Sequence, residues 1–135
     1  MPLIAVAPET ALGSEQENAQ ETAAAGARAV VALFRRWGLT DQQACTLLGG
    51  LSASTYNRWK RGQVGRIGPD LTARLSNLLG IHKALRILLV EPGRSYDWVH
   101  RPNAAFGGAS ALEIMLGGDL TDLMRVRAHL DAARG

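Results

Sequence analysis

The chain has 135 residues, of which 47% are hydrophobic and 20% are charged, with 15 Lys and Arg against 12 Asp and Glu. This length fits one domain, or one domain with a small appendage, and a lone cysteine, Cys45, excludes an internal disulfide framework. No apolar run reaches the length that spans a bilayer, and no basic residue precedes the short apolar stretch near the N-terminus. We therefore expect a cytoplasmic protein without a membrane partner.

The first part of the chain predicts a flexible arm followed by a helix. Residues 1–21 are rich in Ala, Glu, Gln and Pro and show little apolar periodicity, which is typical of a poorly ordered terminus. From residue 22 onward, apolar side chains such as Phe34 and Trp37 recur at helical spacing, and Gly38 ends this helix. The arm carries acidic residues and no Lys or Arg, so the positive charge of the protein lies further along the chain.

Two short helices separated by glycines are predicted next. Thr40 is a favourable N-cap for a helix over residues 41–48, and Ser52 is one for a helix over residues 53–60 that Gly62 ends. Two capped helices joined by a glycine-containing turn form the geometry of a helix-turn-helix. This geometry predicts operator DNA as a partner.

The second of these helices has the character of a recognition helix. Tyr56 and Trp59 are three residues apart, share one face, and are expected to point into the core. The other face is short and polar near its start, where side chains can reach base edges, and basic residues that suit phosphates follow. The predicted DNA-binding residues are Ala53, Ser54, Asn57, Arg58, Lys60 and Arg61.

The same segment contains the pattern Ser-x-Ser-Thr-x-x-x-Trp-x-x-Gly, which begins at Ser52 and includes Trp59 and Gly62. This pattern resembles the end of the Xre/Cro-type helix-turn-helix. One departure is an extra residue in the turn, over residues 49–51, and it leaves open which side chains contact bases. A helical core with no role in DNA binding is the alternative that the residues alone allow.

The rest of the chain predicts one long helix and two shorter ones. Leucines recur at helical spacing over residues 70–90, and a turn over residues 103–108 is expected to anchor Phe106 inward. Two further capped helices, over residues 110–116 and 119–132, are too short to be stable alone and must pack on the long helix, on a second copy or on another protein. With no β-rich stretch, the predicted fold class is all-α.

The C-terminal stretch carries a second, longer pattern. Its residues are Pro102-Asn103, Ala105-Phe106-Gly107-Gly108, Ser110, Leu112, Met115-Leu116, Gly118-Asp119-Leu120 and Val126-Arg127. This pattern resembles the toxin-binding domain of the Xre/MbcA/ParS antitoxins, with Ala104 standing where the family often has proline. We therefore expect three parts: an arm over residues 1–21, a DNA-binding and dimerisation region over 22–95, and a toxin-binding domain over 96–135.

This resemblance implies a specific function. Such antitoxins neutralise RES-domain toxins, which consume NAD⁺, by covering the active-site entrance with the C-terminal region, and they repress their own operon as toxin–antitoxin complexes. A homodimer within a larger complex is expected because such repressors bind two-fold operators. The residues that the resemblance assigns to toxin binding are Phe106, Asp119, Arg125, Arg127, His129 and Arg134.

No pattern of catalytic or metal-binding residues stands out. His82, His100 and His129 are scattered, and none has a metal-ligand spacing with Cys45, so we expect no enzyme activity, no cofactor and no metal. Two other functions stay open. One is a stand-alone Xre-type repressor whose C-terminal segment only dimerises, and the other is a structural interaction module that has lost DNA binding.

Overall fold

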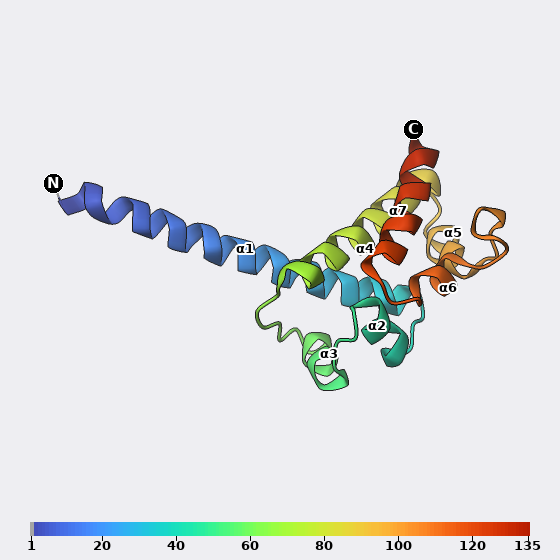
Figure 1. The fold of residues 1–135 in the computed structure, drawn as a ribbon, viewed down its shortest axis with the longest axis horizontal. Helices are drawn as coiled ribbons and strands as arrows, with labels where there is room; N and C mark the ends of the chain where they lie inside the picture. The colour runs from blue at the N-terminus through green and yellow to red at the C-terminus, as the bar shows by residue number, and fades with distance from the viewer. Residues whose placement is uncertain (1) are drawn as a thin grey trace.

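The structure is a computed structural model that describes the backbone of residues 2–135 and the side chains of residues 14–135. This described backbone contains helices and no strand, which confirms the all-α fold (Figure 1). The α-helices are α1 (Pro2–Arg36), α2 (Asp41–Leu47), α3 (Ala53–Lys60), α4 (Pro69–Leu88), α5 (Pro92–Asp97), α6 (Ala111–Met115) and α7 (Leu120–Arg134). Two 3₁₀ turns, η1 (Trp98–His100) and η2 (Ala104–Phe106), lie between α5 and α6.

Helix α1 begins much earlier than the sequence predicts. Residues 2–21, expected as a poorly ordered arm, are part of this one helix, which projects away from the body of the molecule (Figure 1). About half of these residues are Ala, Glu and Gln, which are strong helix formers, and the helix continues through Pro8 and Gly13, which disfavour it. Within the described side chains, burial on α1 starts only at Ala24 and then continues through Phe34 to the end of the helix.

The predicted caps of α2 and α3 are confirmed. The backbone N–H of Gln43 donates to Oγ1 of Thr40 at 3.1 Å, and the side chain of Gln43 accepts from the backbone N–H of Thr40 at 3.0 Å. The hydroxyl of Ser52 accepts from the backbone N–H of Thr55 at 3.2 Å. Gly49 and Gly50 form the turn between the two helices with φ of +79° and +85°, a region that favours glycine.

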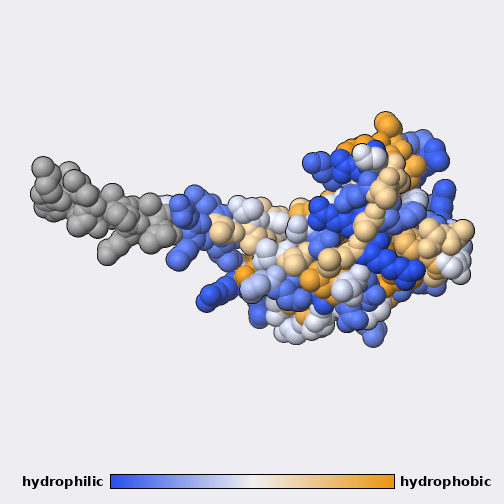
Figure 2. Space-filling view, turned by 45° about the horizontal axis from the view of Figure 1, so that its top comes forward, coloured by the Kyte–Doolittle hydropathy of each residue, from blue (hydrophilic) through white to orange (hydrophobic). Residues whose placement is uncertain are grey.

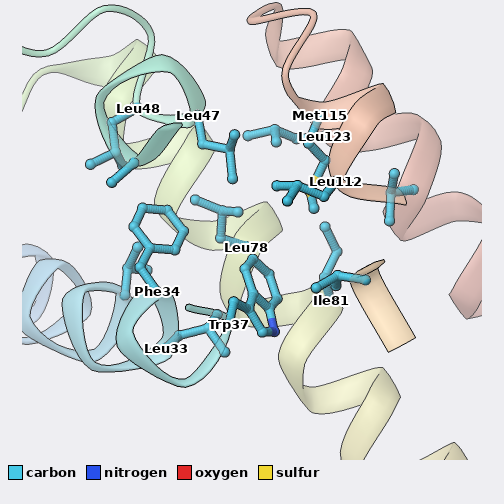
Figure 3. Close-up of a cluster of buried hydrophobic side chains, with 14 of the residues drawn as sticks. Leu33, Phe34, Trp37, Leu47, Leu48, Leu78, Ile81, Leu112, Met115 and Leu123 are labelled. Carbon is cyan, nitrogen blue, oxygen red and sulfur yellow. The ribbon is translucent and has the colours of Figure 1, made fainter. Parts of the chain in front are cut away.

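One hydrophobic core joins the helix-turn-helix to the C-terminal helices. Figure 3 shows side chains from α1, α2, α4, α6 and α7 converging on Trp37 and Leu78. Tyr56 and Trp59 of α3 also belong to this core, each 3% exposed, as predicted. The C-terminal helices are therefore packed on α4, one of the partners that the sequence left open. The labelled residues of the cluster are Leu33, Phe34, Trp37, Leu47, Leu48, Leu78, Ile81, Leu112, Met115 and Leu123.

A buried arginine on α4 ties three segments together. The Nε of Arg74 donates to Oδ2 of Asp70 at 2.9 Å, while its Nη1 donates to the carbonyl of Leu47 at 3.3 Å and to that of Gly118 at 2.9 Å. The residue is only 7% exposed. Gly49 leaves the space for it, because a Cβ at that position would lie 2.8 Å from Nε of Arg74. The guanidinium thus links the end of α2, α4 and the turn before α7.

Helix α5 is held against α4 and the end of α1 through stacked rings. The ring of His82 on α4 stacks on Tyr96 of α5, with 5.8 Å between centroids and 13° between planes. The guanidinium of Arg36 lies 5.3 Å from the centroid of the same Tyr96 ring. Burial lowers the pKa of His82 below its ordinary value, and the nearby charges of Arg86 and Arg36 add to this effect. The prediction that His82 is a packed, half-buried residue is confirmed.

Substitution of Gly49 tests the role of Arg74. Gly49→Ala and Gly50→Ala both place a side chain at positive φ, which costs roughly 1–2 kcal/mol each. Only the first also displaces Arg74 from its bonds, because nothing lies within 4 Å of a Cβ at Gly50. We expect Gly49→Ala to lower the free energy of unfolding by about 1–3 kcal/mol more than Gly50→Ala, measured by urea denaturation. Equal losses for the two variants would contradict the role given to Arg74.

The packing of His82 predicts a pH dependence of stability. Since the pKa of His82 is lower in the folded chain than in the unfolded one, the unfolded chain binds more protons near this pKa. The stability that depends on neutral His82 is therefore fully present above pH 6.5, the ordinary pKa of histidine. It is lost as the pH falls through the lower pKa of the folded chain. Urea midpoints between pH 7.5 and pH 5 are expected to fall less steeply for His82→Gln than for the natural chain. Parallel slopes would show that His82 is not responsible.

Candidate DNA-binding and toxin-binding surfaces

The face of α3 that points away from the core carries the predicted base-reading residues. Ala53, Ser54 and Asn57 are all exposed, whereas Tyr56 and Trp59 on the same helix are buried. This division follows from the spacing of the two aromatic residues, which fixes how α3 is rotated on its support. The short polar side chains are thereby presented to solvent near the start of the helix.

The basic residues of α3 divide into two kinds. Arg58 and Arg61 are exposed, and Nη2 of Arg58 donates to Oγ1 of Thr55 at 3.2 Å, which keeps its side chain alongside the helix. By contrast, Nζ of Lys60 lies 2.7 Å from Oδ2 of Asp41 on α2 and 5.6 Å from the centroid of the Tyr56 ring. Lys60 therefore joins the two helices, whereas Arg58 and Arg61 have no ion pair among the described residues.

The contact between α2 and α3 also raises the pKa of two side chains, Tyr56 and Cys45. Burial, with a further contribution from the carboxylate of Asp41, raises the pKa of Tyr56 to about 12. The same two causes raise the pKa of the Cys45 thiol, against the opposing charge of Lys60. Cys45 is thus a protonated thiol packed against the core, as the sequence favours, and not an activated nucleophile.

A cluster of aromatic rings holds the C-terminal loop against α7. The centroid of Phe106 lies 5.1 Å from that of His129 in an edge-on arrangement, and Trp98 stacks on His129 at 6.2 Å. The guanidinium of Arg125 covers the Phe106 ring at 5.6 Å. Phe106 is 5% exposed, so it supports this surface from beneath, in agreement with the predicted inward anchor. Trp98 had no predicted role, since its partner is thirty-one residues away and no local spacing relates them.

The turn that carries Phe106 has the expected geometry. Oδ1 of Asn103 accepts from the backbone N–H of Ala105 at 2.9 Å, and the backbone N–H of Asn103 donates to the carbonyl of Ala109 at 3.0 Å. Gly107 and Gly108 have φ of +65° and +90°, which lets the chain reverse here. The loop is thus closed by its own backbone before α6 begins.

The charged residues predicted for toxin binding are not equally available. Nη1 of Arg127 donates to the carbonyl of Ser76 at 3.4 Å, its Nε lies 3.5 Å from Oδ2 of Asp131, and its side chain passes over Gly80, so this residue docks α7 on α4. Asp119 caps α7, and its backbone N–H donates to Oδ2 of Asp122 at 3.0 Å. His129 is half-buried in the aromatic cluster. Asp119, Arg125 and Arg134 are exposed, and Nη1 of Arg134 lies 3.8 Å from Oδ1 of Asp131.

The end of the molecule near the C-terminus also exposes aliphatic side chains, including Leu88 of the predicted apolar stripe. Ile87 and Leu88 at the end of α4 are 50% and 37% exposed, and Val90 just after it is 81% exposed. Figure 2 shows hydrophobic surface at this end of the molecule. Helical periodicity alone does not separate these residues from the buried leucines before them, because the difference depends on where α7 ends.

In the part of the chain that the structure describes, no helix combines the length and the apolar character needed to cross a membrane. The described residues also hold no group of three or more His, Cys, Asp or Glu side chains placed to bind a metal ion.

Comparison with known families matches both halves of this arrangement. Residues 16–80 match the antitoxin Xre-like helix-turn-helix domain, and residues 84–135 match the antitoxin Xre/MbcA/ParS C-terminal toxin-binding domain. The chain is also 47% identical over 107 residues to an uncharacterized protein, y4oB, of Sinorhizobium fredii (strain NBRC 101917 / NGR234), a span that covers 77% of this chain and 82% of that protein. The chain thus belongs to the Xre/MbcA/ParS antitoxin family, with a helix-turn-helix domain followed by a toxin-binding domain.

Proposed function

We propose that this antitoxin neutralises a RES-domain toxin that degrades NAD⁺, by covering the entrance of its active site with residues 119–135. The observation that carries the proposal is the exposure of Arg125 and Arg134 on α7, within the region matched to the toxin-binding domain. An active site that receives NAD⁺ holds its anionic pyrophosphate with cationic or donor groups of its own, so we assign Arg125 and Arg134 to the rim of the entrance, where a planar guanidinium can bind carboxylates of the toxin.

The packing of α7 supports this role, because a rigid helix loses little freedom on binding. Arg127 fixes α7 to α4, and the ring of His129 is held between Trp98 and Phe106. The exposed aliphatic residues Ile87, Leu88 and Val90 fall within the same matched region and offer an apolar contact area. Apolar exposure of this kind is typical of a protein–protein interface.

Charge reversal on α7 tests the proposed contact. We expect the double variant Arg125→Glu, Arg134→Glu to bind the toxin encoded beside its gene at least roughly tenfold more weakly, because each change replaces an exposed cation of the proposed contact by an anion. Growth of cells that express the toxin should fail with this variant and recover with the natural antitoxin.

Arg66→Glu is the matched control, since Arg66 is an exposed arginine in the loop between α3 and α4. It should bind the toxin as the natural chain does. A double variant that still neutralises the toxin with unchanged affinity would refute the covering role of α7.

We also propose that the protein represses its own operon as a homodimer, alone or bound to the toxin. Support comes from the exposed polar face of α3 and from the exposed charges of Arg58 and Arg61. A homodimer would present two copies of α3, and two-fold operators have the symmetry to receive them. The extra residue in the turn does not prevent α3 from packing normally, because Tyr56 and Trp59 are both buried.

Two substitutions on α3 separate base reading from phosphate binding. With the duplex upstream of its own gene, Asn57→Ala should weaken specific binding by about 1–3 kcal/mol and leave binding to a scrambled duplex unchanged. Arg58→Ala should weaken both and lower the salt dependence of binding. Arg94→Ala, an exposed arginine on α5, should change neither. Absence of any preference for the natural duplex, even with toxin present, would contradict operator binding.

A further inference from the structure

A groove of about 540 Å³ lies between α1 and α4, where α1 leaves the body of the molecule (Figure 1). Its lining is largely apolar or small, and Leu79 at its floor comes within 3.8 Å of a Cβ built on Gly26. We call it the α1–α4 groove. The lining residues that matter here are Ala19, Thr22 and Gly26 from α1, and Leu75, Ser76 and Leu79 from α4.

The segment of α1 beside this groove contacts the rest of the chain only lightly, with Nε2 of Gln20 donating to the carbonyl of Gly65 at 2.8 Å. None of the described side chains from residue 14 to residue 23 is buried, whereas Ala24 and the residues that follow it enter the core. A helix that lacks tertiary contacts is marginal in water, since most helical stability in proteins comes from packing. No further helix of the described chain covers this groove or the segment of α1 beside it.

Charge indicates which helix that is. On α1, Glu15 lies one turn before Ala19 on the face that lines the groove, and on α4, Lys83 lies one turn after Leu79 on the groove face. Both residues are exposed. Since Gly26 is level with Leu79, a second α1 laid antiparallel across Thr22 brings its Glu15 to the level of Lys83. Two-fold symmetry makes this contact twice.

We propose that the α1–α4 groove is occupied by α1 of a second copy of this chain, in an antiparallel pair closed by Glu15 and Lys83. This inference deepens the homodimer proposed above by assigning its interface. The small side chains at Ala19 and Gly26 allow the two α1 helices to approach closely, and the partner helix covers the exposed part of Leu79. The α3 faces and the C-terminal ends take no part in the contact.

The mass of the full chain in solution tests the interface. Light scattering behind size exclusion should give twice the 14.4 kDa of one chain at micromolar concentration. Ala19→Arg should raise the dissociation constant of the dimer at least roughly tenfold, because an arginine fills the groove with a charge. The control is Ala32→Arg, an exposed alanine of α1 outside the groove, which should leave the dimer intact.

The two charges test the antiparallel arrangement. Glu15→Lys and Lys83→Glu should each weaken the dimer, and the double variant should restore it, because the exchanged charges attract again. Circular dichroism would check that Ala19→Arg keeps its helix content. A monomeric natural chain, a dimer indifferent to Ala19→Arg, or a double variant no stronger than the singles would overturn the proposal. A monomer that still binds the toxin would overturn this interface alone and leave the proposed neutralisation standing.

Discussion

The arrangement of this antitoxin depends on one buried guanidinium. A charge removed from water is tolerated only when it is paired and its N–H groups are hydrogen-bonded. Arg74 meets that condition with a carboxylate from its own helix and two carbonyls, one from the end of α2 and one from the turn before α7. If the helix-turn-helix and α7 moved apart, this cation would lose partners while still buried. Their relative position is therefore a condition of stable folding and not an adjustable joint.

Around this contact, α4 acts as the shared support of both functional surfaces. Its buried leucines pack against Phe34 of α1 and Trp37 just after α1 on one side, and against residues of α6 and α7 on the other (Figure 3). The recognition helix α3 reaches the same core through Tyr56 and Trp59, and through the ion pair of Lys60 with Asp41. Each surface consists of exposed side chains on a helix whose opposite face is fixed, so both surfaces are formed before any partner arrives.

Much of this could be predicted from the sequence because the signals are local. The caps at Thr40 and Ser52, the inward face of α3 and the turn that carries Phe106 all depend on residues within a few positions of each other. The unforeseen features depend on distance along the chain. The pairing of Lys60 with Asp41, the stacking of Trp98 on His129 and the bonds of Arg74 join residues that only the complete fold brings together. The helical state of residues 2–21 was missed for another reason, since this segment has no apolar stripe and contains Pro8 and Gly13, which oppose the helix preference of its Ala, Glu and Gln.

The two matched regions adjoin at residues 80 and 84, within the continuous helix α4 and not in a linker. This position has a geometric consequence. One residue added to a helix turns everything beyond it by about 100° and advances it by about 1.5 Å. Because α7 and the turn before it are bonded to α4 before this point, through Ser76 and Arg74, a single insertion in the middle of α4 would take its second half out of register with α7. The length of this stretch therefore fixes the position of the toxin-binding domain relative to the exposed face of α3.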